Sequence, residues 1–408
     1  MVSVLALAAL VRPAVSEHYE SKFLKGKKNG AADALAVTGE NAGYAKALGA
    51  VYFESHGPSD LQKAEALFKK SLSENPLDSD AWLWLARVYN DTGRKRLAES
   101  AVSNALERSA GAPDVIWNSG VLLLQMDDTD AGVEQFKTYI GLNPGEQRNV
   151  YALCMALGLS PQYIQQKLVP PDMQHLQQWL YFLMDSKQQD AAANAWEELL
   201  ETGKEKGQAP PSDRDYLRYC DFLIESGKQS DALAVWNALF SQTKITHKPG
   251  RIWDGGFELP VTEGGFGWRI GKAPGVRIFL DGDIKTAGQY SLSASFDGTS
   301  NPDIYIARQI VPVEQGHKYE VSGYIKTSRI TTDNGIFLAV QGYNCAGLNA
   351  SSQTVTGTNY WEKQSIEFTV PPDCNAVWFG IRRAVSDKLD NKISGDVWID
   401  QISMSGQD

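Results

Sequence analysis

The stretch Trp82-Leu-Trp-Leu-Ala-Arg-Val-Tyr89, followed by Ala98 and Val102, decides the fold of the first half of this chain. Its alternation of large and small residues recurs every 34 positions, so that Phe68, Val102 and Phe136 occupy equivalent places. Such a period predicts one pair of helices per unit, and each pair can bury its apolar face only against the next copy. We therefore expect an all-α solenoid.

The pattern resembles the tetratricopeptide repeat over about residues 40–246, although the register is lost over roughly 146–170. The resemblance implies a right-handed superhelix whose concave groove binds a protein partner. The alternative is a spacer that holds a second domain at a distance. Three copies carry the resemblance most clearly: Ala45, Gly49, Tyr52, Ala64 and Phe68; Trp82, Leu85, Ala86, Tyr89, Ala98 and Val102; and Ile116, Gly120, Leu123, Gly132 and Phe136.

After His247 the hydrophobic period changes to two, which is typical of strands with one buried face. Clusters of Gly, Pro, Asn and Asp separate the alternating segments, as turns require. Short strands spread over ~155 residues predict an antiparallel sandwich. The chain is thus multidomain, with a solenoid over 14–246 and an all-β domain over 250–408. The alternating segments are 290–296, 303–310, 318–325, 336–340 and 377–381.

Six motifs in order make the β-domain resemble the jelly-roll, galactose-binding-like carbohydrate-binding modules that are attached to xylanases and cellulases. The resemblance covers about 250–405. It implies that the domain binds polysaccharide, although jelly rolls also serve protein contacts. The motifs are Trp253-Asp-Gly-Gly-Phe-Glu258, Gly267-Trp268, Gly288-Gln-Tyr-Ser-Leu292, Val311-Pro-Val-Glu-Gln-Gly-His-Lys-Tyr-Glu-Val-Ser-Gly-Tyr324, Tyr360-Trp-Glu-Lys363 and Gly395-Asp-Val-Trp-Ile-Asp-Gln-Ile-Ser403.

The same resemblance implies one structural calcium. In that family the opening and closing strands lie side by side and their carboxylates often hold the ion, and the matching residues here are Glu258 and Asp400. Carboxylate oxygens are the ligands that a hard cation prefers. The competing interpretation is that Glu258 caps a turn and Asp400 faces solvent.

A sugar site needs aromatic platforms for the C–H faces of the rings and hydrogen-bonding groups for their hydroxyls. Strand alternation requires that one of two consecutive arginines points away from the core. Most other aromatic residues of the sandwich are expected in its core. The candidate carbohydrate-binding residues are Tyr305, Gln341, Tyr343, Asn344, Trp361, Trp378, Arg382 and Arg383.

Charge and motif content exclude two classes of function. The formal net charge of −10 argues against nucleic acid as a partner, because such proteins present a basic patch to phosphates. The five histidines lie in no catalytic motif, and the sequence contains no P-loop, so we expect no enzyme. Cys345 and Cys374 both fall in the β-domain, and their pairing stays open at this point.

The apolar segment 1–13 is too short to cross a bilayer, which needs about 20 residues. It is either part of a signal or membrane anchor or a first helix packed on the solenoid. We expect a bacterial protein that is exported, periplasmic or anchored in the inner membrane, in which the segment would tether the chain. Its expected function is a non-catalytic scaffold in exopolysaccharide assembly or export. The alternative is a purely protein-binding scaffold whose β-domain is an interaction or capping module.

Overall fold

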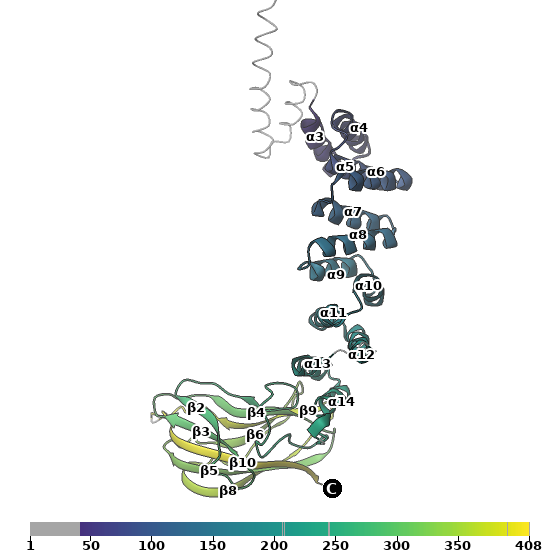
Figure 1. The fold of residues 1–408 in the computed structure, drawn as a ribbon. Helices are drawn as coiled ribbons and strands as arrows, with labels where there is room; N and C mark the ends of the chain where they lie inside the picture. Colours follow the sequence, from purple (N-terminus) through teal and green to yellow (C-terminus); the bar gives the residue numbers. More distant parts are fainter. Residues whose placement is uncertain (1–40, 206, 208, 244, 390, 408) are drawn as a thin grey trace, which may run out of the picture. The chain divides into compact units, whose positions relative to one another are not determined.

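A computed structural model describes residues 41–408 except 206, 208, 244, 390 and 408 (Figure 1). The expectations for the apolar segment 1–13, and for helices over 14–40, lie outside the described residues. The chain divides into two compact units, Met1–Phe182 and Leu183–Asp408. None of the described helices combines the length and the hydropathy that crossing a bilayer requires.

The helical part confirms the all-α prediction. Helices joined by short loops follow one another along the described chain from residue 42 to residue 239, and a short 3-10 turn follows (Figure 1). The helices are α3 (Ala42–Ser55), α4 (Pro58–Glu74), α5 (Ser79–Asp91), α6 (Lys95–Arg108), α7 (Pro113–Gln125), α8 (Thr129–Leu142), α9 (Gln147–Ala156), α10 (Pro161–Leu168), α11 (Met173–Asp185), α12 (Gln189–Glu205), α13 (Asp213–Glu225) and α14 (Gln229–Leu239).

Small residues let the two helices of a pair approach each other. A Cβ atom on Gly49 of α3 would lie 2.8 Å from the ring of Phe68 in α4, which is fully buried. Likewise, a Cβ atom on Gly120 of α7 would lie 3.0 Å from the ring of Phe136 in α8. Since side chains close-pack in such cores, any larger residue at these positions would force the helices apart.

The region where the repeat register is lost forms the two shortest of these helices. α9 has 10 residues and α10 has 8, whereas α6 and α8 have 14 each. α10 ends at Leu168, directly before Val169 and the Pro170-Pro171 pair, because proline removes a backbone donor and disfavours helical geometry in the preceding residue.

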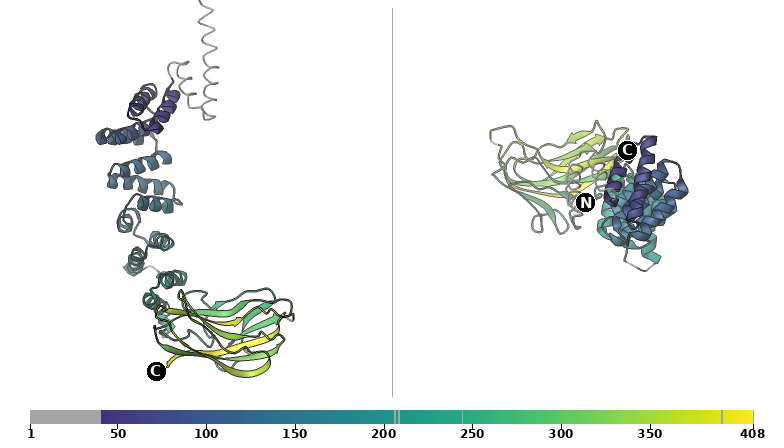
Figure 2. Two further views of the ribbon diagram at one scale, coloured as in Figure 1. Left: turned by 180° about the vertical axis from the view of Figure 1, so that it is seen from behind. Right: turned by 90° about the horizontal axis from the view of Figure 1, so that it is seen from above.

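The second half of the chain is the predicted antiparallel sandwich, with two five-stranded sheets as separate layers (Figure 1 and Figure 2). Sheet A has the order β1-β4-β9-β6-β7 and sheet B the order β2-β3-β10-β5-β8. All five alternating segments are confirmed as strands. The strands are β1 (Arg269–Ile270), β2 (Val276–Asp281), β3 (Ser291–Asp297), β4 (Ile304–Pro312), β5 (Lys318–Ile330), β6 (Phe337–Gly342), β7 (Asn349–Ser351), β8 (Gly357–Thr369), β9 (Ala376–Arg383) and β10 (Ser394–Gln407).

The core of the sandwich lies between the two sheets. Alternate residues of β9, namely Val377, Phe379 and Ile381, meet Val397 and Ile399 of β10 there, and all five are fully buried. This alternation leaves the residues between them on the outer face of each sheet. Four of the eight predicted site residues lie on the outer face of sheet A.

The second compact unit contains the last helices as well as the sandwich. Trp236 of α14 is fully buried and its ring packs edge to face on Trp253 and Phe266, which belong to the loop that leads into the sandwich. His247 packs on the same two rings. Packing thus continues across 246–250, where the sequence predicts a change of domain, and that division stays a prediction.

Candidate functional site

The candidate site is the outer face of sheet A, where β4, β9 and β6 run side by side. Trp378 and Arg382 of β9 point away from the core because Val377, Phe379 and Ile381 point into it. Arg382 pairs in register with Tyr305 on β4, and Trp378 with Gln341 on β6. Four of the eight predicted residues are therefore neighbours on this face.

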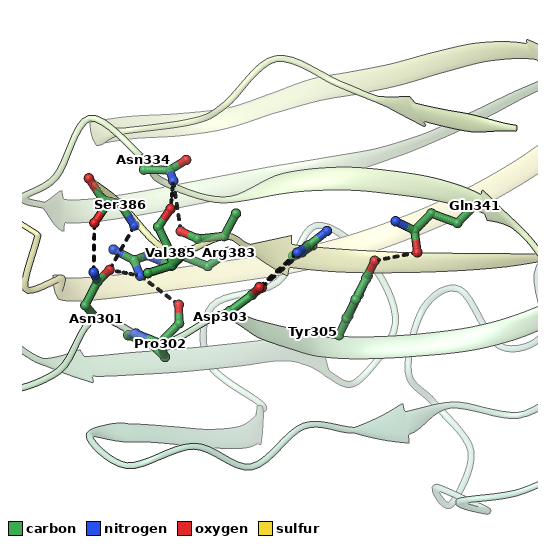
Figure 3. A network of polar contacts seen from close by, with 11 residues as sticks. Asn301, Pro302, Asp303, Tyr305, Asn334, Gln341, Arg383, Val385 and Ser386 are labelled. Carbon is green, nitrogen blue, oxygen red and sulfur yellow. Dashed lines mark hydrogen bonds and ion pairs between the residues drawn. The ribbon is translucent and has the colours of Figure 1, made fainter. Parts of the chain in front are cut away.

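Tyr305 lies flat across the neighbouring strand β9. Its hydroxyl donates a 3.1 Å hydrogen bond to Oε1 of Gln341 on β6, so the ring spans from one side of β9 to the other (Figure 3). Gly380 makes this possible, because a Cβ atom there would come within 2.5 Å of the tyrosine ring. The ring is a preformed apolar platform with a polar group fixed at its tip, the arrangement that suits a sugar.

Trp378 is enclosed by cations and by a second aromatic ring. The guanidinium carbon of Arg308 lies 4.3 Å from the centroid of the Trp378 ring, and that of Arg269 lies 5.3 Å from it. The ring of Tyr343 meets Trp378 edge to face at 5.8 Å. Cation–π contacts of this kind stabilise the observed positions of the rings and of the guanidinium groups.

The guanidinium groups differ in their partners. Arg382 forms a bidentate pair with Asp303, with distances of 3.0 and 3.1 Å to one carboxylate oxygen and 3.0 Å to the other. Burial lowers the pKa of Arg382, but the hydrogen bonds to Asp303 outweigh this and raise it. In the part of the chain that the structure describes, exposed Arg308 has no carboxylate within ion-pair distance. Arg308 is thus the cation most available to a ligand.

A disulfide joins Cys345 and Cys374, the pair that the sequence left open. It ties the loop after β6, which carries Tyr343, to the turn before β9, which carries Trp378. The backbone N–H of Tyr343 also donates to the carbonyl of Ala376 over 3.0 Å. The crosslink therefore fixes the two rings at this end of the face relative to each other.

Three predicted residues lie elsewhere or play other parts. Arg383 is fully buried, which corrects its assignment. The side chain of Asn301 and, at 2.7 Å, the carbonyl of Pro302 accept hydrogen bonds from its guanidinium group (Figure 3). The carbonyl of Asn391 accepts a third at 3.0 Å. Trp361 lies on β8 of sheet B, away from the other candidates. Asn344 is exposed beside Tyr343 with a positive φ of 54°.

The sequence-based prediction missed Arg269 and Arg308. Arg308 is three positions from Tyr305, so simple alternation would place the two on opposite faces. A register shift between Tyr305 and Ala307 brings them onto one face. Arg269 lies in β1, which has only two residues and carries no clear strand pattern. Only the order of the strands could reveal that it faces Trp378.

The proposed calcium ligands both clamp one loop of sheet B. Glu258 accepts the backbone N–H of Gln289 at 2.8 Å, and Asp400, which is fully buried, accepts that of Thr286 at 2.7 Å. The described residues contain no group of three or more His, Cys, Asp or Glu side chains that could hold a metal. The two carboxylates are satisfied by N–H donors, which fits a cation poorly, so calcium stays a prediction.

A hollow of about 520 Å³ opens in the helical part, within the first compact unit. It lies between the end of α8, the last residues of α10 and the segment that follows α10. Apolar and basic side chains share its walls, which are formed by Lys137, Ile140, Gly141, Pro144, Gln147, Gln166, Lys167, Leu168, Val169, Pro170, Pro171 and His175.

Two family models match separate parts of the chain. Residues 57–115 match a tetratricopeptide repeat, and residues 236–384 match a carbohydrate binding domain. The two matches fall on the helical repeats and on the β-sandwich, respectively. The second match contains the whole of β4, β6 and β9, and hence the face built around Tyr305 and Trp378. No curated protein matches the chain.

Solved structures resemble one part of the chain or the other. "Crystal structure of MamA" is 16% identical and covers 46% of this chain and 96% of its own, with a TM-score of 0.29. "CBM4 structure and function" is 18% identical and covers 38% and 99%, with a TM-score of 0.29. The CBM22-1 xylan-binding domain of Paenibacillus barcinonensis Xyn10C is 13% identical and covers 40% and 97%, at 0.27. These values are too low to support any inference about function.

Proposed function

We propose that the chain is a non-catalytic adaptor whose β-sandwich binds polysaccharide on the outer face of sheet A. The flat ring of Tyr305, anchored to Gln341 across Gly380, is the observation that carries this proposal. It offers an apolar surface to one face of a sugar ring, while Arg308 and Arg382 offer donors to its hydroxyl or acidic groups. The match of this region to a carbohydrate binding domain supports the same conclusion.

The helical repeats supply the second half of the proposed function, which is to bind a protein partner. Repeats of this kind present extended surfaces for such contacts, and residues 57–115 match their family model. The hollow beside α8 and α10 is a further place where an apolar side chain of a partner would fit. Joining a protein and a glycan in one chain suits a role in bacterial exopolysaccharide assembly or export.

An exported location follows from the same proposal. We call the part of the outer face of sheet A around Tyr305 and Trp378 the glycan face. The disulfide between Cys345 and Cys374 lies beside it, and such bonds persist in oxidising compartments such as the bacterial periplasm. In the periplasm the protein would encounter polysaccharide that is being exported. We therefore place the working protein outside the cytoplasm, either free in the periplasm or tethered through its N-terminal segment.

The test is glycan binding by the full chain, screened on an array and quantified by affinity gel electrophoresis against polysaccharides. We expect Tyr305→Ala to weaken binding by roughly tenfold or more, because the ring contributes the central contact. The matched control is Tyr360→Ala, since Tyr360 is 87% exposed on β8 of sheet B. Trp361→Ala is also expected to leave binding unchanged.

Two outcomes would contradict the proposal. A chain that binds no glycan over a broad panel, yet binds a defined protein partner, would be a scaffold whose sandwich serves protein contacts. Equal losses in Tyr305→Ala and Tyr360→Ala would place the glycan somewhere other than the outer face of sheet A.

A further inference from the structure

Helix α13 reaches the edge of the glycan face through the carboxylate of Asp221. Oδ1 of Asp221 accepts a hydrogen bond from Nη2 of Arg269 at 2.8 Å, and another from the backbone N–H of Gly265, also at 2.8 Å. The Asp221 side chain is 37% exposed and that of Arg269 is 19% exposed. Burial raises the pKa of Asp221, whereas Arg269 and the Gly265 N–H act in the opposite direction.

Arg269 connects Asp221 to the aromatic rings of the glycan face. Its Nη1 donates to the carbonyl of Gly265 at 3.0 Å, and its guanidinium carbon lies 5.3 Å from the Trp378 ring. A guanidinium held by both a carboxylate and a carbonyl has few orientations left. Asp221 thus determines where Arg269 sits over Trp378, although Asp221 precedes Trp378 by more than 150 residues in the sequence.

The loop between the helices and β1 is shaped for this contact. Gly265 has a φ of +55°, and a Cβ atom there would lie 2.4 Å from the ring of Trp236 in α14. At Gly264 a Cβ atom would lie 3.0 Å from Oδ2 of Asp221. The loop therefore lies directly on α13 and α14, and glycine is needed for that close approach.

The electrostatic surroundings of Tyr343 agree with the contact that Asp221 makes with Arg269. Burial raises the pKa of Tyr343, and the negative charges of Glu225 and Asp221, both on α13, add to this effect. The ring of Tyr343 in turn packs on Trp378. The last helical pair and the aromatic cluster of the glycan site consequently form one continuous structure within the second compact unit.

We infer that helix α13 is a functional part of the glycan-binding site, in which Asp221 is a positioning residue that holds Arg269 over Trp378. This inference rests on the proposed function of the face. It means that the smallest glycan-binding unit includes the last helical pair. A fragment that begins at residue 250 would lack Asp221 and would bind the same polysaccharide less well than the full chain.

The experiment compares Asp221→Asn with the unaltered full chain, using the polysaccharide that binds best in the glycan screen. We expect a loss of affinity of roughly three- to tenfold, because Arg269 loses a charge-assisted hydrogen bond and its orientation. The matched control is Glu201→Gln on α12, which removes one exposed carboxylate from the helical part. Melting temperatures are measured for all variants, so that a folding defect is recognised.

A local signal separates positioning from a general structural effect. With 5-fluorotryptophan incorporated, the ¹⁹F resonance of Trp378, assigned through Trp378→Phe, is expected to shift in Asp221→Asn and to stay in place in Glu201→Gln. Arg269→Lys keeps the charge but not the planar group, and we expect a comparable loss of affinity. If Asp221→Asn does not fold, the inference is tested by the glycan affinity of Arg269→Lys and by the shift of the Trp378 ¹⁹F resonance in that variant.

The possible results distinguish this inference from the proposed function. Unchanged affinity in both Asp221→Asn and Arg269→Lys, with Trp378→Ala abolishing binding, would overturn the role of α13 and leave the glycan site intact. If both Trp378→Ala and Tyr305→Ala bound the polysaccharide as well as the unaltered chain, the proposed glycan site on sheet A would itself be wrong.

Discussion

The helical pairs α7–α8 and α13–α14 have the same helix–turn–helix structure, but different parts of the chain pack against them. In α7–α8, within the first unit, Gly120 packs on Phe136 and the apolar contacts run between helices close in the sequence. In α13–α14, within the second unit, Trp236 packs on Trp253 and Phe266, and Asp221 binds Arg269 of β1. The first pair is completed by local contacts, and the second by a loop that belongs to the sandwich.

The difference shows how the last helical pair becomes part of the unit that contains the sandwich. A solenoid pair must cover its exposed apolar face, and the usual cover is another repeat. Here the loop at 251–268 supplies that cover, and the same loop leads into β1 at the edge of the glycan face. The residues that end the solenoid therefore also hold one end of the site.

The largest expected effect is that of Trp236→Ala. Removing this fully buried ring should cost about 3 to 5 kcal/mol, because it leaves a cavity between α14 and the loop. Calorimetry of the full chain should show a lower transition for the second unit. In Phe136→Ala, the matched change in α8, the transition of the first unit should fall instead. A lowered transition of the same unit in both variants would contradict the comparison.

Acid should destabilise the second unit through His247. Burial lowers the pKa of this side chain from 6.5 to about 4, so the unfolded chain binds the proton more readily. Stability is therefore lost as the pH falls from about 6.5 towards 4, by up to about 3 kcal/mol. Denaturant unfolding at several pH values would measure this loss, and His247→Phe should reduce it. Identical pH profiles for the two proteins would remove His247 from the explanation.

Loss of the disulfide should affect both stability and glycan binding. The double variant Cys345→Ala/Cys374→Ala should lose about 2 to 4 kcal/mol, because the crosslink no longer restricts the unfolded chain. Its glycan affinity should fall as well, since Tyr343 is released from Trp378. Cys154→Ala, at a buried free cysteine of the first unit, should leave glycan affinity unchanged. Full affinity in the double variant would show that Tyr343 needs no crosslink.

The smallest expected effect is that of calcium at Glu258 and Asp400. Their oxygen atoms already accept backbone N–H groups of the loop at 286–290, so a bound ion would add little. We expect a chelator to lower the melting temperature of the second unit by no more than roughly 2 to 4 °C, corresponding to about 1 kcal/mol. A melting temperature that does not respond to either calcium or chelator would remove the metal.

Prediction from sequence succeeded where neighbours in the chain are also neighbours in space. The 34-residue period placed Gly49 and Phe68 in one helical pair, and the alternating segment 377–381 is a strand that carries the candidate Trp378. It failed where one extra residue changes the face, as at the bulge before Arg308. It also failed at Arg383, whose partners lie in two loops, the one with Pro302 far away in the sequence and the one with Asn391 near. Alternation allows one arginine of the pair to point outward, and only the core packing shows which.

The sequence by itself determined the two classes of structure, because hydrophobic period is a local property that each helix or strand expresses without its partners. It also determined that aromatic residues and arginines would lie on β4 and β9. Only the tertiary structure decided that Tyr305 crosses Gly380 to reach Gln341 and that Asp221 of α13 holds Arg269. Such contacts depend on strand order, bulges and loop paths, which arise when distant segments pack together.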